Sequence, residues 1–353
     1  MFNPSRLSTA RKRRQLTKKA LAEKAGITQI TLTRLETKGE NEPKEETVDS
    51  LAKALNYPVE FFYQDDLEAA QESTISFRSL TKLTARQKDA AISASEIAQL
   101  LDEWISARFN LPEADLLDLR DEQPVEAAAA LRRHWGLGNK PIAHMLKLLE
   151  AKGVRIFSLD ENNLNVDAFS HWRNGVPYIF LNIYKSAERS RFDAAHELGH
   201  LVLHQHGEVT GREAEREADQ FASAFLVPRE DFKAHIPPMP SLQRLITAKK
   251  RWGVSAAAMA RTAYDSGVTS DWHYRDLCKQ ISMRGFRKQE PEPMEREQSV
   301  LWKKLLEALW SEGITKDKIA KELALPLDEV AALIDGLLIN NSERQQVTFP
   351  KGI

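Results

Sequence analysis

Residues 192–206 read FDAAHELGHLVLHQH. The apolar residues of this stretch recur at helical spacing, which predicts a buried helix. His196 and His200 stand four residues apart, so both imidazoles lie on one face of that helix, about one turn from each other. Two imidazoles in this arrangement can bind a single tetrahedral zinc ion, for which histidine nitrogen is a common ligand.

The carboxylate beside the first histidine gives this motif a possible chemistry. Glu197 is suited to act as a general base on an attacking water and then to deliver the proton to a leaving amine. A purely structural metal site gains nothing from such a base, so the motif favours peptide-bond hydrolysis. Zinc is assigned from ligand type, and manganese or iron could occupy the same ligands. Three residues near the motif in sequence are candidate donors to an oxyanion: His171, Tyr178 and Arg191.

A third metal ligand is expected downstream, and two histidines compete for the role. His206 follows His196 by ten residues, but that spacing needs a glycine turn at position 203, where the chain has Leu203. An unbroken helix would carry His204 two turns away from His196. Neither histidine is therefore the favoured ligand.

The acidic stretch REAEREADQFASAFLVP, residues 212–228, offers a better candidate. Glu215 and Asp219 are four residues apart and share one face of the predicted helix. Glu215 can bind the metal while Asp219 accepts a hydrogen bond from a ligand imidazole and orients it. Glu213 and Glu217 remain alternatives to Glu215.

The chain around the motif predicts a mostly helical α+β fold with a small sheet. Residues 154–159 and 178–183 are rich in β-branched and aromatic residues, and we expect these two strands to pair. Helical periodicity or capping signals predict helices over residues 84–109, 125–136, 141–152, 187–204, 212–226 and 300–338.

The N-terminal stretch LTKKALAEKAGITQITLTRLE, residues 16–36, has the pattern of a helix-turn-helix. Thr17 and Thr28 are expected N-caps of two successive helices, and Gly26 supplies the turn between them. In the second helix we expect Ile30, Leu32 and Leu35 to face the core and the polar residues to face solvent.

Charge distribution supports a polyanion as partner for this segment. The whole chain has 353 residues and a net charge of −1, but residues 6–38 hold ten Lys or Arg against two Glu, a local charge of +8.

No apolar run is long enough to span a membrane, and the N-terminus lacks the apolar core of a signal peptide. With Cys278 as the single cysteine, we expect a cytoplasmic protein without an internal disulfide.

Residues 6–63 resemble the XRE (Cro/repressor-like) helix-turn-helix family through ALAEKAG, TRLE, the Glu-Pro before the fourth helix and LAKALNYPVEFF. The resemblance implies a five-helix domain that binds double-stranded operator DNA. We expect a homodimer, because paired half-sites favour two-fold symmetric proteins. It assigns the DNA contacts to Lys18, Gln29, Thr31, Thr33 and Arg34, with Lys38 as a candidate phosphate contact.

Residues 124–236 resemble the ImmA/IrrE metallopeptidases through LRRHWGLGNKPI, LEAKGVRIF, VPYIFLN, AHELGHLVLH and EREADQFASAFLVP. The resemblance implies zinc held by His196, His200 and Glu215, with Glu197 catalytic and Asp219 as a hydrogen-bonding partner. Members of that family inactivate helix-turn-helix repressors, so a repressor-type protein is the expected substrate. The chain itself, cut near residues 66–84, is the other candidate.

These observations predict four segments. They are a DNA-binding domain (1–66), a helical linker region (67–120), a metallopeptidase domain (121–273) and a C-terminal helical region (274–353) that contains a second helix-turn-helix-like unit. The expected function is a DNA-binding regulator whose zinc endopeptidase site cleaves a repressor-type protein, or the chain itself, and so controls stress, toxin–antitoxin or mobile-element genes. The alternative is a non-catalytic transcription factor or antitoxin whose metal site is structural or sensory.

Overall fold

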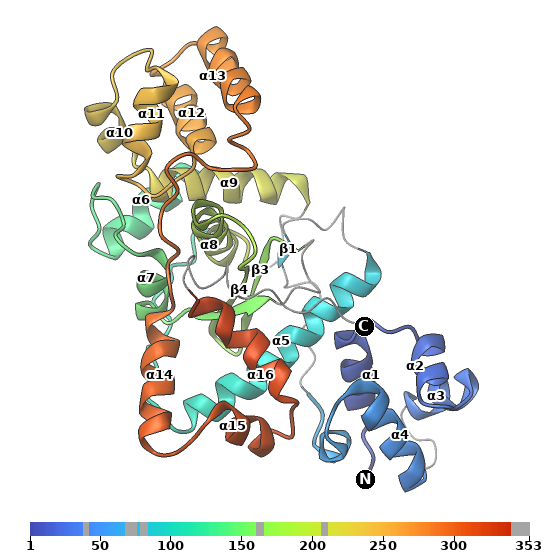
Figure 1. Ribbon diagram of the computed structural model, residues 1–353. Helices are drawn as coiled ribbons and strands as arrows, with labels where there is room; N and C mark the ends of the chain where they lie inside the picture. Colours follow the sequence, from blue (N-terminus) through green and yellow to red (C-terminus); the bar gives the residue numbers. More distant parts are fainter. Residues whose placement is uncertain (38–41, 68–75, 78–83, 160–165, 206–210, 340–353) are drawn as a thin grey trace.

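The predicted motif helix is α8 (Ala187–Leu203), which lies near the centre of the larger domain (Figure 1). Ser186 caps its first turn by accepting a hydrogen bond from the Arg189 amide. The computed structural model describes residues 1–37, 42–67, 76–77, 84–159, 166–205 and 211–339.

A mixed sheet packs against α8. Its strands are β1 (Ser76–Phe77), β2 (Arg155–Leu159), β3 (Ala168–Arg173) and β4 (Val176–Asn182), in the order β1-β3-β4-β2. β2 pairs with β4 in parallel, as the two predicted strands were expected to pair, and the other two pairings are antiparallel. β1 comes from the segment that joins the N-terminal domain to the rest of the chain.

The hairpin between β3 and β4 was not predicted, although the sequence contains its signal. The two strands are joined by Asn174 and Gly175 alone, and Arg173 pairs directly with Val176. Both loop residues have positive φ, +48° and +77°, which a two-residue hairpin turn of this type requires. Asn-Gly between two β-rich runs is therefore the feature that identifies the missing strand.

Most predicted helices form close to their expected bounds. They include α5 (Ala85–Ser106), α6 (Pro124–His134) and α9 (Arg212–Leu226). The predicted start of the next helix at residue 141 was wrong, since α7 (Met145–Ala151) begins four residues later. Extended backbone at His144 and its side-chain bond from the Lys147 amide make that residue the N-cap.

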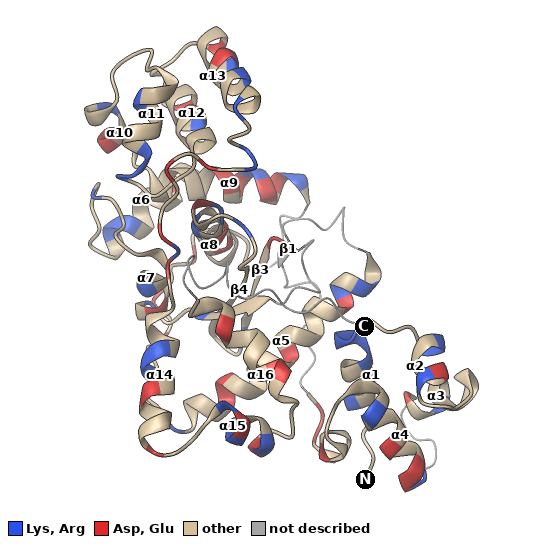
Figure 2. Cartoon of the chain, viewed as in Figure 1, with Lys and Arg blue, Asp and Glu red and all other residues tan. Residues whose placement is uncertain are grey.

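The N-terminal domain consists of four helices and a short 3-10 turn. They are α1 (Pro4–Arg13), α2 (Lys18–Lys24), α3 (Gln29–Leu35), α4 (Glu45–Leu55) and η1 (Val59–Tyr63). Thr17 and Thr28 cap α2 and α3 as predicted, and Gly26 has a φ of +67° at the turn. Figure 2 shows basic residues on α1 and α2 and acidic residues on α4.

The C-terminal third is helical. Its elements are α10 (Arg229–His235), α11 (Leu242–Lys249), α12 (Ala256–Asp265), α13 (Asp271–Met283), α14 (Val300–Ser311), α15 (Lys316–Glu322), α16 (Leu327–Ile334) and η4 (Asp335–Leu337). The charged stretch between α13 and α14 is irregular but well anchored. Glu290 accepts from the Ala256 amide at the start of α12, and Glu297 accepts from the Met145 amide at the start of α7.

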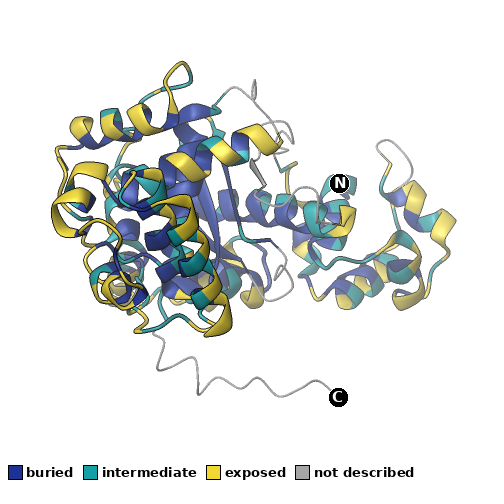
Figure 3. Ribbon diagram, turned by 90° about the horizontal axis from the view of Figure 1, so that it is seen from above, coloured by how far each residue is buried: buried dark blue, intermediate teal, exposed yellow. Residues whose placement is uncertain are grey.

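Buried residues gather around the sheet and α8, with a smaller group inside the N-terminal domain (Figure 3). α5 connects the two groups, because it packs against α1 on one side and against β2 and α16 on another. Among the described residues, no helix is long and apolar enough to cross a membrane.

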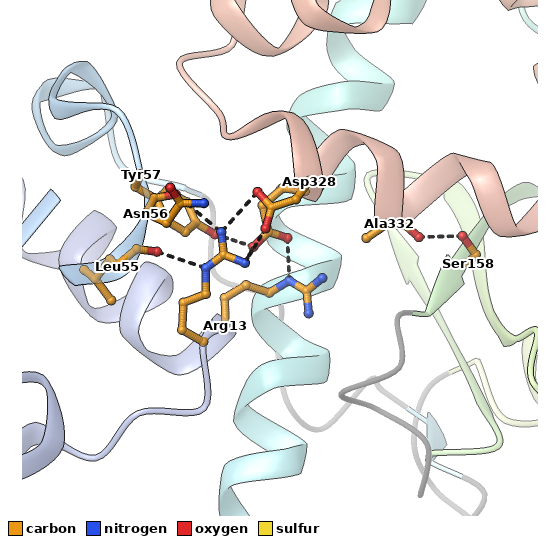
Figure 4. Close-up of polar contacts among 9 residues, drawn as sticks. Arg13, Leu55, Asn56, Tyr57, Ser158, Asp328 and Ala332 are labelled. Carbon is orange, nitrogen blue, oxygen red and sulfur yellow. Dashed lines mark hydrogen bonds and ion pairs between the residues drawn. The ribbon is translucent and has the colours of Figure 1, made fainter. Parts of the chain in front are cut away.

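A buried ion-pair cluster joins the N-terminal domain to α16 (Figure 4). Glu329 accepts from Arg13 Nε at 2.7 Å and from the Tyr57 hydroxyl at 2.9 Å. Burial raises the pKa of Tyr57 well above its usual range, so the phenol remains a donor. Arg14 binds the neighbouring Asp328 through two nitrogens, at 2.7 and 3.2 Å. We call these five residues the interdomain clamp.

The opposite side of α16 contacts the sheet. Ser158 of β2 donates to the carbonyl oxygen of Ala332 at 2.6 Å (Figure 4). Just beyond the helix, a Cβ on Gly336 would stand 2.3 Å from Ile183 Cδ1 and 3.1 Å from Ser158 Cβ, so a larger residue would force these side chains to move. One short helix therefore touches both the N-terminal domain and the strand layer beside α8.

The local charge of +8 counted over residues 6–38 overstates the positive charge available to a polyanion, because several of these arginines bind groups within the protein. Arg6 Nε donates to the Asp65 carbonyl oxygen, and Arg11 binds Glu36. Arg13 and Arg14 belong to the interdomain clamp. A count of charges cannot distinguish arginines that bind carboxylates in the same chain from those that face solvent.

The clamp predicts a strong contrast between two adjacent acidic residues. Glu329→Gln should lower the free energy of unfolding by about 3–5 kcal/mol, since it leaves the buried Arg13 guanidinium without its counter-charge. Asp328→Asn should cost less than about 1 kcal/mol, because Asp328 is 52% exposed. Denaturant unfolding of both variants measures the difference, and equal losses would contradict the assignment of the clamp to Glu329.

Candidate functional site

Three potential metal ligands from two helices converge at one point. His196 and His200 of α8 bring their Nε2 atoms to 3.1 Å from each other. Glu215 of α9 places one carboxylate oxygen 3.5 Å from His196 Nε2 and the other 3.4 Å from His200 Nε2. Among the described residues, these three form the group whose donor atoms could hold a metal ion.

The spacing of these atoms fits a tetrahedral ion. Zinc–nitrogen and zinc–oxygen bonds of roughly 2.0–2.1 Å at tetrahedral angles separate neighbouring ligand atoms by about 3.3 Å. The separation of the two Nε2 atoms, and the separation of each from the nearer Glu215 oxygen, lie between 3.1 and 3.5 Å. Two imidazoles and a carboxylate also match the ligand set of catalytic zinc sites that keep one position open.

Close packing of α8 on α9 brings Glu215 to the histidines. Gly199 of α8 lies against α9, where an added Cβ would stand 3.1 Å from Phe221 Cδ1 and 3.3 Å from Ala218 Cα. Even a single added methyl group at this position would require Phe221 or the backbone of α9 to move by a few tenths of an ångström. Sequence reasoning assigned no role to Gly199, although a glycine inside a predicted helix costs about 1 kcal/mol relative to alanine and so signals a packing requirement.

In each ligand histidine, Nδ1, the ring nitrogen that does not face Glu215, has a partner. Asp219 of α9 lies 2.9 Å from His196 Nδ1, as the predicted hydrogen bond requires. A carboxylate at Nδ1 favours the tautomer that carries its proton there, which leaves the Nε2 lone pair directed toward Glu215.

The second histidine is held through a longer chain of contacts. His200 Nδ1 lies 2.9 Å from His204 Nδ1, and His204 Nε2 lies 2.9 Å from a carboxylate oxygen of Glu217. If His204 donates from Nε2 to Glu217, its Nδ1 accepts from His200 and leaves His200 Nε2 as an electron-pair donor. His204 and Glu217 were both considered from the sequence as possible ligands. His204 instead contacts the ligand His200, and Glu217 contacts His204.

The electrostatics of the cluster favour the protonation states that metal ligands need. Burial lowers the pKa of His200 to about 4, so its imidazole is neutral at pH 7. Burial would raise the pKa of Glu215, but hydrogen bonds with His196 and His200 outweigh it and lower that pKa to about 2. A neutral imidazole and a carboxylate are the forms that bind a cation.

Glu197 occupies the sheet-facing side of α8. Its side chain is fully buried, and Ser170 Oγ of β3 donates to its Oε2 at 2.6 Å. A second hydrogen bond links β3 to the same helix, from Trp172 Nε1 to the Leu201 carbonyl oxygen at 2.8 Å. The strand beside α8 therefore fixes the position of the predicted general base, a role for Ser170 that sequence reasoning missed.

The remaining candidates lie elsewhere. Glu213 is exposed and pairs with Arg216, and His206 falls outside the described residues. The three candidate oxyanion donors have other contacts. His171 lies 2.8 Å from Ser95 of α5, Tyr178 donates to Asp102, and Arg191 binds Glu297.

The helix-turn-helix presents α3 on the outer side of the N-terminal domain, away from α5 and α16 (Figure 1). Gln29, Thr33 and Arg34 are exposed there. Thr31 is partly buried and bonds to the Thr28 hydroxyl, and Lys18 lies 3.2 Å from Glu36. Lys38 falls outside the described residues.

One apolar residue of α3 was misplaced by the sequence analysis. Ile30 was expected in the core, but it is 68% exposed, while Leu32 and Leu35 are buried. Helical residues two positions apart in sequence are separated by about 200° around the helix axis, so Ile30 cannot share the face of Leu32. An exposed isoleucine beside Gln29 adds an apolar group of the kind that contacts thymine methyls in the major groove.

The cluster predicts which residues determine metal content. Supplied with zinc and then dialysed, the wild-type protein should retain about one ion per chain, and His196→Ala and Glu215→Ala should lose it. Glu213→Ala is the matched control, because that carboxylate lies on the same helix but is 65% exposed. Elemental analysis measures the ratio, and a full complement in Glu215→Ala would point to a different third ligand.

Comparison with known families agrees with both halves of this description. A helix-turn-helix family profile matches residues 7–62, which contain α2, α3 and the exposed residues of α3. A profile described as the IrrE N-terminal-like domain, from the M78 peptidases, matches residues 149–264, which contain all three candidate ligands and Glu197. A search of curated proteins finds no match to the chain. The chain thus carries an XRE-type helix-turn-helix at its N-terminus and, following it, an IrrE N-terminal-like domain of the M78 peptidase family.

Proposed function

We propose that this protein is a DNA-binding transcriptional regulator with a zinc endopeptidase site that cuts a repressor-type protein or its own chain. The observation that carries the proposal is the convergence of His196, His200 and Glu215 beside the buried Glu197. The three ligands account for metal binding, while Glu197 supplies a carboxylate that metal binding does not use.

The residues divide the chemistry among them. Zinc held by the three ligands would polarise a peptide carbonyl and make water more acidic. Glu197 accepts a proton from the attacking water and passes it to the departing amine. Ser170 keeps the Glu197 carboxylate in place through the bond to Oε2. Asp219 and His204 keep the two imidazoles turned toward the metal position.

The same chain supplies the regulatory half. A helix whose exposed side carries Gln29, Thr33 and Arg34 offers hydrogen-bond donors for adenine and guanine edges in the major groove. We expect double-stranded operator DNA as the partner and a homodimer as the binding form, since two-fold symmetric readers match paired half-sites. Because the DNA-binding domain and the peptidase site are in one chain, cleavage would be confined to proteins that control the same genes.

The peptidase proposal predicts that Glu197→Gln abolishes cleavage and keeps the metal. The amide cannot accept the proton, but the ligands are untouched, so zinc content should equal that of the wild type. Cells that express either form are compared by sequencing new protein N-termini, and candidate repressors are then incubated with purified zinc-loaded protein. New termini should appear with the wild type alone.

Glu213→Gln is the control for the change of charge, since it alters an exposed carboxylate of α9. It should cleave like the wild type. Identical N-termini and identical gene regulation in wild type and Glu197→Gln would instead support a non-catalytic transcription factor or antitoxin with a structural metal site.

The DNA-binding proposal predicts unequal effects from two changes that each remove one positive charge. Arg34→Ala, in α3, should weaken binding to the operator by about 1–3 kcal/mol through a lost base contact. Lys53→Ala, on the exposed side of α4, should change it much less. Operators are selected from random DNA with the wild-type protein, and affinities are compared at a single salt concentration. Equal losses would indicate a purely electrostatic role for Arg34.

A further inference from the structure

Strand β1 lies on the edge of the sheet nearest the candidate catalytic base. It consists of Ser76 and Phe77, from the segment between η1 and α5, and pairs antiparallel with β3 (Figure 1). Ser76 stands opposite Ser170, and Phe77 stands opposite Phe169. Because the order is β1-β3-β4-β2, β1 covers the side of β3 that β4 does not use.

The partner of Ser76 is the residue that binds the base. Ser170 Oγ donates to Glu197 Oε2, and neighbouring strands in a sheet are about 4.8 Å apart. The backbone of Ser76 is therefore one strand spacing from the residue that holds Glu197. No other element of the described chain intervenes in the sheet between β1 and β3.

An exposed strand edge is a binding surface for extended polypeptide of any sequence. Its free amide and carbonyl groups bond to the backbone of an added strand, which is how many domains capture peptides. An endopeptidase needs its substrate held by the backbone in one extended geometry beside the reacting groups. The outer edge of β3 meets both requirements, because it is a strand edge and it holds the general base.

We propose that β1, residues 76–77 of this chain, is a resident occupant of the outer edge of β3, the edge along which an extended peptide would lie beside Glu197. The inference rests on the proposed peptidase function and adds how that site is filled. A protein substrate must displace β1 before it can lie beside Glu197. The occupant is covalently tethered, so its effective concentration at the edge is in the millimolar range.

β1 stands in the chain between two parts that have contacts of their own. Before it comes the N-terminal domain, which the interdomain clamp joins to α16. After it comes Thr84, which caps α5 through a reciprocal pair of bonds with Gln87. Among the described residues of this segment, Ser76 and Phe77 pair with β3, and a longer strand could replace these two pairings.

The test measures peptide binding rather than turnover. All proteins carry Glu197→Gln, so that a bound peptide is not hydrolysed. The double variant Ser76→Pro, Phe77→Pro removes both backbone N–H groups of β1 and cannot pair with β3. Ser76→Ala, Phe77→Ala is the matched control, because it shortens the side chains and keeps both N–H groups. The probe is a fluorescent synthetic peptide that spans residues 70–83.

Peptide affinity, from fluorescence anisotropy, should be about tenfold higher for the proline variant than for the parent, since no tethered competitor remains. The alanine variant should stay near the parent. In the proline variant, amide hydrogen exchange at residues 168–171 should quicken and should slow again when peptide is added. A peptide with prolines at the positions of Ser76 and Phe77 should not bind, and this control needs no further change to the protein.

Equal affinity in all three proteins, or unchanged exchange along β3, would overturn the proposal. Unchanged exchange in α8 and β4 shows that the proline variant is folded, so a negative result cannot be attributed to misfolding. Failure of this test leaves the peptidase proposal intact, because binding is measured without hydrolysis. Conversely, a chain that never cleaves protein could still bind the peptide at this edge.

Discussion

The contact between α8 and α9 at Gly199 is the constraint on which the site depends. Two of the three ligands follow from one helix, since His196 and His200 share a face at any packing distance. Glu215 reaches them because α9 packs closely on α8 at Gly199, where Phe221 lies 3.1 Å from the position that a Cβ would take. The same approach brings Asp219 and Glu217 within 2.9 Å of His196 and His204. Separating the helices would remove the third ligand and both supporting carboxylates together.

The other side of α8 links the metal position to the rest of the molecule. Ser170 of β3 holds Glu197, so the sheet positions the base while α9 positions the metal ligands. The sheet in turn contacts α16, and α16 carries Glu329, to which the N-terminal domain is bound through Arg13. The helix-turn-helix domain and the candidate catalytic centre are therefore parts of one continuous packing arrangement. The buried arginines of α1 serve that arrangement, and this is why fewer basic residues remain for DNA than a charge count implies.

Sequence reasoning succeeded where the determining contacts are short in range. The threonine caps of α2 and α3 and the bounds of α9 all depend on residues within four positions. It failed where a local signal was overlooked or misjudged. The pair Asn174-Gly175 is a sequence signal for the β3–β4 hairpin. Ile30 stands two residues from Leu32, and this spacing places Ile30 outside the buried face of α3. The domain boundaries at residues 66, 120 and 273 stay predictions.

The sequence by itself determined the histidine pair, the adjacent base, the helix-turn-helix and the acidic helix that supplies Glu215, because each depends on spacing along one helix or on a family pattern. Only the tertiary structure decided that Ser170 holds Glu197, that His204 connects His200 to Glu217, that Glu329 holds Arg13, and that β1 covers the outer edge of β3. Most of these contacts join residues far apart in the chain, and no periodicity relates their positions. They arise when helices and strands pack and bring side chains from separate elements within hydrogen-bonding distance.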